Sequence, residues 1–96
     1  MEVLVVYDVD TVKAAGRKRL RRVAKVCEGY GQRVQDSVFE CTLSEEQMER
    51  LRTRLVEIID AEQDSLRIYR LMQPRERMVE ELGRRLANDL HDPLVL

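Results

Sequence analysis

The chain has 96 residues, which is enough for one domain and too few for two. Hydrophobic residues make up 44% of it and charged residues 36%, so it carries too much apolar material for a disordered segment, and we expect a soluble globular domain. The formal net charge of −1 excludes a uniformly basic or acidic protein, but it hides a strong local asymmetry.

The first predicted element is a strand over residues 2–7, which are largely apolar and β-branched. Such a short, nearly continuous apolar run is typical of a buried central strand, and it ends at Tyr7 and Asp8. The run is far shorter than the roughly 20 residues that span a bilayer, and no positively charged leader or cleavage site accompanies it. We therefore expect a cytoplasmic protein that does not contact a membrane.

An amphipathic helix is predicted over residues 12–28, where apolar positions recur at intervals of three and four residues and two glycines, Gly29 and Gly31, follow. The apolar positions are Gly16, Leu20, Val23, Ala24 and Cys27. All charges between residues 11 and 27 are positive: Lys13, Arg17, Lys18, Arg19, Arg21, Arg22 and Lys25. Such a helix either contacts phosphates or is a solvated face that acids elsewhere balance, and composition leaves both readings open.

Residues 33–42 alternate as a strand does, and a bulge or turn is expected near Asp36 and Ser37 that divides them into two paired segments. Ser44 and Gln47 have the spacing of a capping box, so a second helix is predicted to follow and to end near Ala61. The apolar face of this helix consists of Met48, Leu51, Leu55, Ile58 and Ile59.

A further strand is predicted over residues 64–71, which completes the order β-α-β-β-α-β. This order indicates an α+β, ferredoxin-like sandwich, with both helices on one face of an antiparallel sheet. The other face would be free to pack against a second copy or to bind a nucleic acid. We expect residues 1–73 to form this core domain and residues 74–96 to form a C-terminal extension, which is part of the same domain or binds a partner.

The extension contains a third amphipathic segment after Pro74, with Met78, Val79, Leu82 and Leu86 in helical phase. It ends in the strand-like residues 92–96. An isolated Leu-Val-Leu terminus would be a liability in water, so we expect it to add to a sheet edge of a partner protomer or of another protein.

The carboxylates of Asp8 and Asp10 leave the first strand just before the basic helix, a place that suits a hard cation. Magnesium prefers carboxylate oxygen and keeps several waters, so one Asp per protomer suffices if a dimer or substrate phosphates complete the coordination shell. An Asp before a helix is more often a cap or a partner of the helix dipole, and that role suits Asp10 better. The single histidine, His91, lies in the tail, so histidine is not expected to act as a base beside Asp8.

Other reactive or aromatic residues indicate no further chemistry. Cys27 and Cys41 lie far apart and outside any CxxC or Cys/His cluster, so we expect reduced core residues rather than a zinc site or a disulfide. Phe39 and three tyrosines are the only aromatic residues, and the pattern of an RNA-recognition motif is missing. Phe39 is therefore expected in the core or in a dimer interface.

Four stretches of the chain, in the right order over about residues 3–71, resemble the CRISPR-associated endonuclease family Cas2, the smaller of the two universal spacer-acquisition proteins. They are Val5-Val6-Tyr7-Asp8-Val9, Arg21-Arg22-Val23-Ala24-Lys25, Tyr30-Gly31-Gln32-Arg33-Val34-Gln35 with Ser37-Val38-Phe39-Glu40-Cys41, and Asp64-Ser65-Leu66-Arg67-Ile68-Tyr69. The pairing of Gly-Gln-Arg-Val-Gln with Ser-Val-Phe-Glu is specific, whereas Tyr-Asp-Val alone is a weak signal.

The resemblance implies a ferredoxin-like homodimer in which Asp8 of each protomer approaches a shared cleft and binds magnesium or manganese. It implies a metal-dependent endonuclease on single-stranded RNA or double-stranded DNA, with Asp8 as the catalytic and metal-binding residue. The arginines that would position the nucleic-acid backbone are Arg17, Arg19, Arg22 and Arg33. The residues that would support the site are Tyr7, Asp10, Ser37 and Phe39.

Two other functions fit the same residues. Members of the family also bridge two dimers of the larger CRISPR integrase, Cas1, and in such a scaffold the basic patches would hold a DNA duplex while Asp8 would be dispensable. A ferredoxin-like regulatory module that binds a small metabolite is a third reading, which the fold permits and the motifs disfavour.

Overall fold

A computed structural model of the chain describes residues 1–84, which form an α+β fold. Its elements are β1 (Glu2–Asp8), α1 (Ala14–Glu28), β2 (Gly31–Gln35), β3 (Val38–Thr42), α2 (Glu45–Ile58), β4 (Ser65–Leu71) and α3 (Arg75–Met78). The first six follow the predicted β-α-β-β-α-β order, so the ferredoxin-like arrangement is confirmed. None of the helices in this part of the chain has both the length and the apolar character that crossing a bilayer requires.

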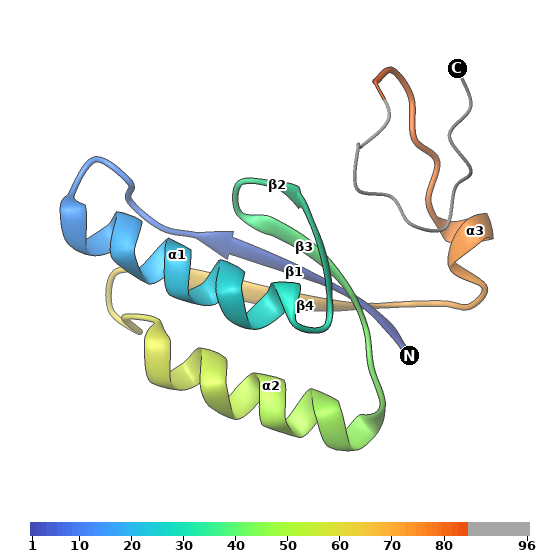
Figure 1. The fold of residues 1–96 in the computed structure, drawn as a ribbon, viewed down its shortest axis with the longest axis horizontal. Helices are drawn as coiled ribbons and strands as arrows, with labels where there is room; N and C mark the ends of the chain where they lie inside the picture. The colour runs from blue at the N-terminus through green and yellow to red at the C-terminus, as the bar shows by residue number, and fades with distance from the viewer. Residues whose placement is uncertain (85–96) are drawn as a thin grey trace.

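The sheet has four strands in the order β2-β3-β1-β4, and each neighbouring pair is antiparallel. Helices α1 and α2 lie side by side on one face of it (Figure 1). The opposite face, which we call the open face, is covered by neither α1 nor α2 (Figure 1). β1 lies between two strands, as its nearly continuous apolar sequence predicts, and β2 and β4 form the two edges.

Alternation along β1 divides the apolar residues between the two faces of the sheet. Val3, Val5 and Tyr7 point toward the helices and are at most 1% exposed, whereas Leu4 and Val6 lie on the open face and are half-buried. The helices complete the core with their apolar faces, which include Val23, Cys27, Leu51 and Leu55. Both cysteines are free and buried, in agreement with the sequence.

The helix ends differ from the predicted ones by a few residues. The capping box of α2 is present, since Gln47 N–H donates to Ser44 Oγ at 3.2 Å and Ser44 N–H donates to Gln47 Oε1 at 2.8 Å. This helix ends at Ile58 rather than near Ala61. Helix α1 begins at Ala14 rather than at residue 12, and its N-cap is Lys13.

The loop from β1 to α1 folds back against the helix it leads into. A Cβ atom on Gly16 would lie 1.8 Å from the backbone oxygen of Asp10, so only glycine permits this approach. The prediction that Asp10 caps the helix is wrong, because the helix starts too far along the chain for its side chain to serve the first turn. No side chain caps α1.

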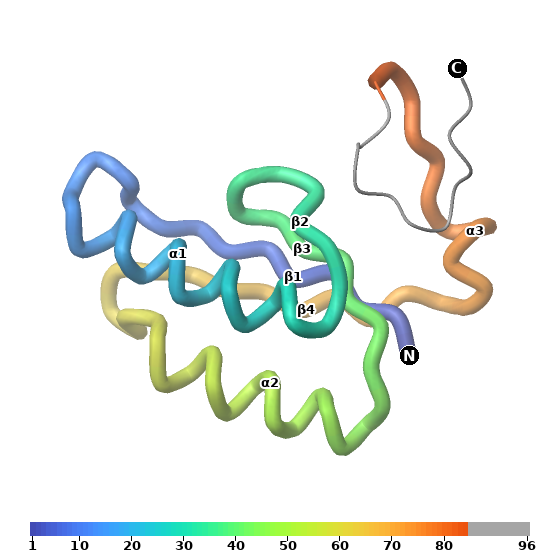
Figure 2. The backbone as a smooth tube through the Cα atoms, in the orientation of Figure 1, coloured from blue at the N-terminus to red at the C-terminus, as the bar shows by residue number. Residues whose placement is uncertain are grey.

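The extension is the part of the described chain where the sequence prediction failed. Helix α3 ends at Met78, Val79 has an extended backbone, and Leu82 is 83% exposed, so the predicted helical phase of these residues is not realised. Figure 2 shows this segment leaving the layered core, and a short amphipathic helix without a surface to pack on has little stability of its own. Arg75 forms an ion pair with Glu40. Leu86, His91 and the strand-like residues 92–96 lie outside the described residues.

Candidate active site

Asp8 is the last residue of β1, and its side chain is exposed on the open face of the sheet. Its carboxylate has no hydrogen bond or ion pair with any residue of the described segment 1–84. Because an unpaired carboxylate at a strand end keeps all of its acceptor capacity, Asp8 is available to a ligand.

Two serines lie beside the end of β1, Ser65 on β4 and Ser37 in the turn between β2 and β3. Ser65, the first residue of β4, is the antiparallel partner of Asp8, so their side chains emerge on the same face. On the other side, Tyr7 N–H donates to the backbone oxygen of Ser37 at 2.9 Å. The backbone of Ser37 thus lies beside the end of β1, and its predicted support of the site stays a prediction. The structure adds Ser65, which the sequence reasoning missed. The signal was present, since the last strand of this topology starts beside the end of the first.

Hydrogen bonds within the loop and from the first turns of α1 hold the loop that follows Asp8 in place. Asp10 Oδ1 accepts a hydrogen bond from the Val12 N–H at 2.9 Å. Arg17 Nη1 donates to the backbone oxygens of Thr11 and Val12, at 3.0 and 2.8 Å. Asp10 and Arg17 therefore order the chain between β1 and α1, and their predicted roles at the site stay predictions.

Arg19 has a partner that sequence periodicity did not indicate. Its Nε and Nη2 donate to the two carboxylate oxygens of Asp64, at 2.8 and 3.0 Å. The Tyr7 hydroxyl and the Asp60 N–H donate to the same carboxylate, the latter at 2.9 Å. The Asp64 side chain is 0% exposed and that of Arg19 is 17% exposed. Arg19 thus lies in a buried ionic contact on the helix side of the sheet, and its predicted role at the nucleic-acid backbone stays a prediction.

The contact between Arg19, Asp64 and Tyr7 shifts the pKa values of Tyr7 and Asp64. Burial raises the pKa of Tyr7 to about 12, and the hydrogen bond to the Asp64 carboxylate adds to the effect. Burial alone would raise the pKa of Asp64, but the hydrogen bonds from Arg19, Tyr7 and the Asp60 backbone outweigh it and lower the pKa below its usual value. At neutral pH Tyr7 is therefore a neutral phenol, Asp64 a carboxylate and Arg19 a charged guanidinium.

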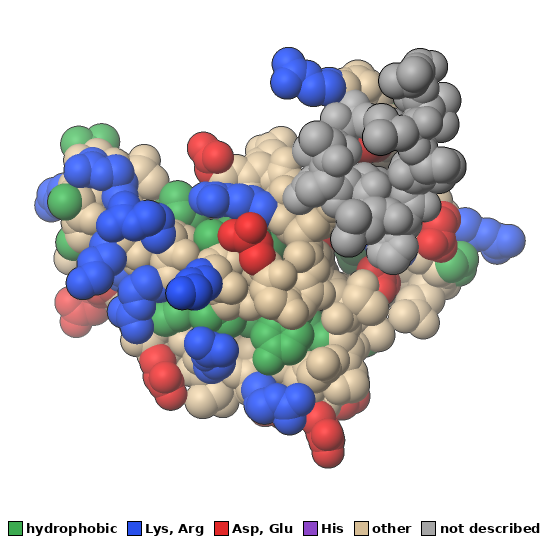
Figure 3. Space-filling model, in the orientation of Figure 1, with side chains coloured by type: hydrophobic (Ala, Val, Ile, Leu, Met, Phe, Trp, Pro, Cys, Tyr) green, Lys and Arg blue, Asp and Glu red, His purple; other side chains and the backbone are tan. Residues whose placement is uncertain are grey.

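The remaining cations of α1 face solvent. Lys18, Arg21, Arg22 and Lys25 are exposed, and Figure 3 shows Lys and Arg side chains gathered along this helix. A row of solvated cations on one helix is a surface to which a phosphate backbone can bind.

Arg33 and Phe39 lie on the β2–β3 hairpin. Arg33 Nε donates to the backbone oxygen of Asp36 at 2.8 Å, and its guanidinium carbon lies 5.7 Å from the centre of the Phe39 ring. Phe39 is 0% exposed, which confirms its placement in the core and leaves no free ring face for stacking on a base.

The donor set at the strand end, a carboxylate and a hydroxyl, is of the oxygen type that magnesium or manganese prefers. No group of three His, Cys, Asp or Glu side chains that could enclose a metal occurs among residues 1–84. Asp8 offers one carboxylate and Ser65 a hydroxyl nearby, and a hard cation of this kind keeps water and accepts ligands from a second molecule.

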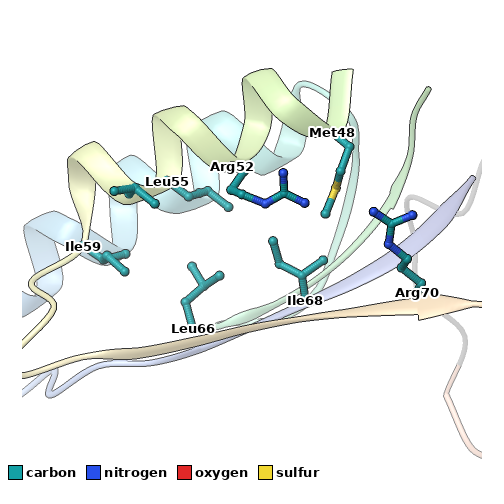
Figure 4. Close-up of a pocket in the computed structure, with 8 residues that line it drawn as sticks. Met48, Arg52, Leu55, Ile59, Leu66, Ile68 and Arg70 are labelled. Carbon is teal, nitrogen blue, oxygen red and sulfur yellow. The ribbon is translucent and has the colours of Figure 1, made fainter. Parts of the chain in front are cut away.

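A separate apolar groove of about 370 Å³ lies between α2 and β4 (Figure 4). It is lined by Met48, Arg52, Leu55, Val56, Ile59, Leu66, Ile68 and Arg70. The side chains of Leu66, Ile68 and Arg70 point from β4 toward α2, on the side opposite to Asp8. The groove is therefore no part of the strand-end site.

Comparisons with known proteins agree on one family. Residues 1–79 match the family model of the CRISPR associated protein Cas2. A CRISPR-associated endoribonuclease Cas2 of Moorella thermoacetica is 53% identical over 96 residues and 100% of both chains, and a CRISPR-associated endonuclease Cas2 of Halalkalibacterium halodurans is 52% identical over 95 residues and 99% of both. The crystal structure of Streptococcus pyogenes Cas2 superposes with a TM-score of 0.82 at 54% identity, over 86% of this chain and 100% of that one.

Proposed function

Because the chain belongs to the Cas2 family of CRISPR-associated proteins, we propose that it is a metal-dependent endonuclease of spacer acquisition, which works in the cytoplasm as a homodimer. The substrate class is single-stranded RNA or double-stranded DNA, and the bond cleaved is the phosphodiester. The relatives named above are an endoribonuclease and an endonuclease, which supports this reaction type.

The observation that carries the proposal is the exposed, unpaired carboxylate of Asp8 at the end of β1. Asp8 would hold magnesium, or manganese, as a catalytic metal ligand, and Ser65 would orient a coordinated water. When bound, such a cation activates a water as nucleophile and neutralises charge on the phosphate oxygens.

The exposed cations of α1 would position the backbone of the nucleic acid. Arg22 and its neighbours Lys18, Arg21 and Lys25 are free to approach phosphates, and Arg17 borders the loop that follows Asp8. Binding through such contacts releases counterions and is independent of sequence. Arg33 on the β2–β3 hairpin remains a further candidate for this role.

The open face of the sheet supports a homodimer. Leu4, Val6 and Val38 are half-buried there, and Tyr69 is 44% exposed. An apolar sheet face of this kind favours packing against a second sheet. Since Asp8 shares this face with Leu4 and Val6, two copies that pack through it bring two carboxylates toward one cleft, where a cation would find its second ligand.

The extension, residues 74–96, would add a second contact between the two copies of the homodimer. β4 is an edge strand, and the groove beside it is largely apolar. The apolar residues 94–96 of a second copy would add to this edge and cover the groove.

Cleavage of labelled single-stranded RNA and duplex DNA by wild type and Asp8→Ala, each with magnesium and with chelator, tests the enzyme role. We expect cleavage that requires metal and falls at least about 100-fold in Asp8→Ala, because the variant lacks its metal ligand. Sedimentation must first show both proteins in the same oligomeric state. Equal cleavage by Asp8→Ala would contradict the proposal.

The row of exposed cations on α1 favours a second candidate, a scaffold that holds duplex DNA between dimers of the larger integrase Cas1. This function needs the basic surface and not Asp8. Undiminished binding of duplex and of Cas1 by Asp8→Ala, together with no cleavage by wild type, would favour the scaffold.

A further inference from the structure

A buried ionic contact joins three segments of the chain at the end of the sheet where Asp8 lies. We call Tyr7, Arg19 and Asp64 the clamp. Tyr7 belongs to β1, Arg19 to α1, and Asp64 directly precedes β4. The Asp64 carboxylate accepts four hydrogen bonds: two from Arg19, one from the Tyr7 hydroxyl and one from the Asp60 N–H.

Each member of the clamp depends on the others. A carboxylate that is 0% exposed is costly unless it is paired, and the fork of an arginine together with a phenol and a backbone amide satisfies it. No buried side-chain polar atom among residues 1–84 lacks a partner. The clamp therefore has one low-energy arrangement, and this arrangement fixes where β1 and β4 end relative to α1.

The clamp and the proposed metal site occupy opposite faces of the same two strand ends. Tyr7 is followed by Asp8 in β1, and Asp64 is followed by Ser65 in β4. Asp8 and Ser65 are antiparallel partners. Because successive side chains of a strand alternate, Tyr7 and Asp64 point toward the helices while Asp8 and Ser65 point to the open face.

From this juxtaposition we infer that Asp64 is a positioning residue, which through Tyr7 and Arg19 holds the carboxylate of Asp8 and the hydroxyl of Ser65 in fixed relation. The inference rests on the proposed function, since it needs Asp8 to be a metal ligand. It also gives Arg19 a role different from that of its exposed neighbours on α1. In this inference Arg19 binds Asp64 and so helps to position Asp8, whereas Arg22 binds the phosphates of the nucleic acid.

A metal ligand at the end of a strand needs residues behind it that hold it in position. Terminal pairs of a sheet open more easily than central ones, and β1 leads directly into a loop. A metal ligand that moves by about 1 Å loses much of its effect, and residues behind the ligands of known metal sites change metal affinity by about 10-fold to 100-fold.

Two variants test the clamp in the full-length protein. Tyr7→Phe keeps the buried ring and removes only the hydroxyl, and Asp64→Asn keeps the shape and removes the charge. Val26→Ala serves as the control, because it truncates a buried side chain in the last turn of α1, away from the clamp. Hydrogen exchange of residues 6–9 and 64–67 reports on the strand ends without metal, and calorimetric titration with manganese alone reports on Asp8.

We expect exchange in these two segments to accelerate about tenfold and manganese affinity to fall about tenfold in both clamp variants. Val26→Ala should lower the melting temperature but leave both quantities at their wild-type values. Exchange as slow as in wild type, or faster exchange with unchanged manganese affinity, would overturn the inference. An equal loss of affinity in Val26→Ala would also overturn it, because the effect would then be one of general stability.

The titration includes Asp8→Ala to separate this inference from the proposed function. If wild type binds manganese and Asp8→Ala does not, the metal role stands and the clamp variants decide the inference. If binding persists in Asp8→Ala, the proposed metal site fails, and the positioning role fails with it.

Discussion

Where β1 ends and β4 begins, the polar side chains on the two faces of the sheet differ in burial and in hydrogen bonding. On the helix side, Tyr7, Arg19 and Asp64 are largely buried, and both oxygens of the Asp64 carboxylate accept hydrogen bonds from within the chain. On the open side, Asp8 is exposed and unpaired within residues 1–84.

The difference separates polar groups that are paired within the chain from one that stays available to a ligand. A buried charge that has all of its partners stabilises one arrangement of the chain and has nothing left to offer a ligand. A carboxylate at the same level of the sheet that has no partner costs the fold little and keeps its capacity for a cation. One strand end thus provides a rigid support and an open ligand position within two consecutive residues.

The largest expected effect lies in stability. Asp64→Ala should lower the free energy of unfolding by about 3 kcal/mol, because it leaves Arg19 and Tyr7 without their acceptor. Asp8→Ala should change it by less than about 0.5 kcal/mol, as for exposed residues without contacts. Urea denaturation of both variants measures the two values. Similar losses in the two variants would remove the distinction between the faces.

The next effect concerns the ionisation of Tyr7. Its pKa of about 12, against about 10 for a free tyrosine, means that the neutral phenol is favoured in the folded state. A raised pKa contributes stability that is complete below pH 10 and disappears as the pH rises through 12. Phenolate absorbance of wild type minus that of Tyr7→Phe isolates this group from Tyr30 and Tyr69. A midpoint near pH 10 would show that the hydroxyl is not held in the clamp.

The sequence predicted the fold well because local patterns determine it. The nearly continuous apolar run of residues 2–7 and the capping box at Ser44 each need only a few neighbouring residues to be recognised, and the strand and the cap are both present. The prediction of a third helix beyond Met78 was wrong because apolar residues at helical spacing form a helix only where they can pack against another surface. Residues 79–84 have no such surface within the described chain.

The position of Asp8 was predictable in the same local way, as the first polar residue after a buried strand. The pairing of Arg19 with Asp64 was not, because the two residues are far apart in the sequence and periodicity says which face a residue occupies, not which side chain it meets. A partial signal existed. Tyr7 lies at a buried position of β1, and a buried tyrosine hydroxyl needs a partner.

The smallest expected effect distinguishes two arginines of one helix. Arg22→Gln should reduce duplex affinity a few fold and lower the slope of log affinity against log salt by about 1, because one phosphate contact is lost. Arg19→Gln should leave that slope unchanged, because the Arg19 guanidinium is bound to Asp64 rather than to phosphate, but it should weaken the fold because glutamine lacks the charged fork that binds both oxygens of Asp64. Fluorescence anisotropy over a salt series measures the slopes, and denaturation measures the stabilities. A reduced slope in Arg19→Gln together with wild-type stability would place Arg19 at the phosphates and make the two arginines equivalent.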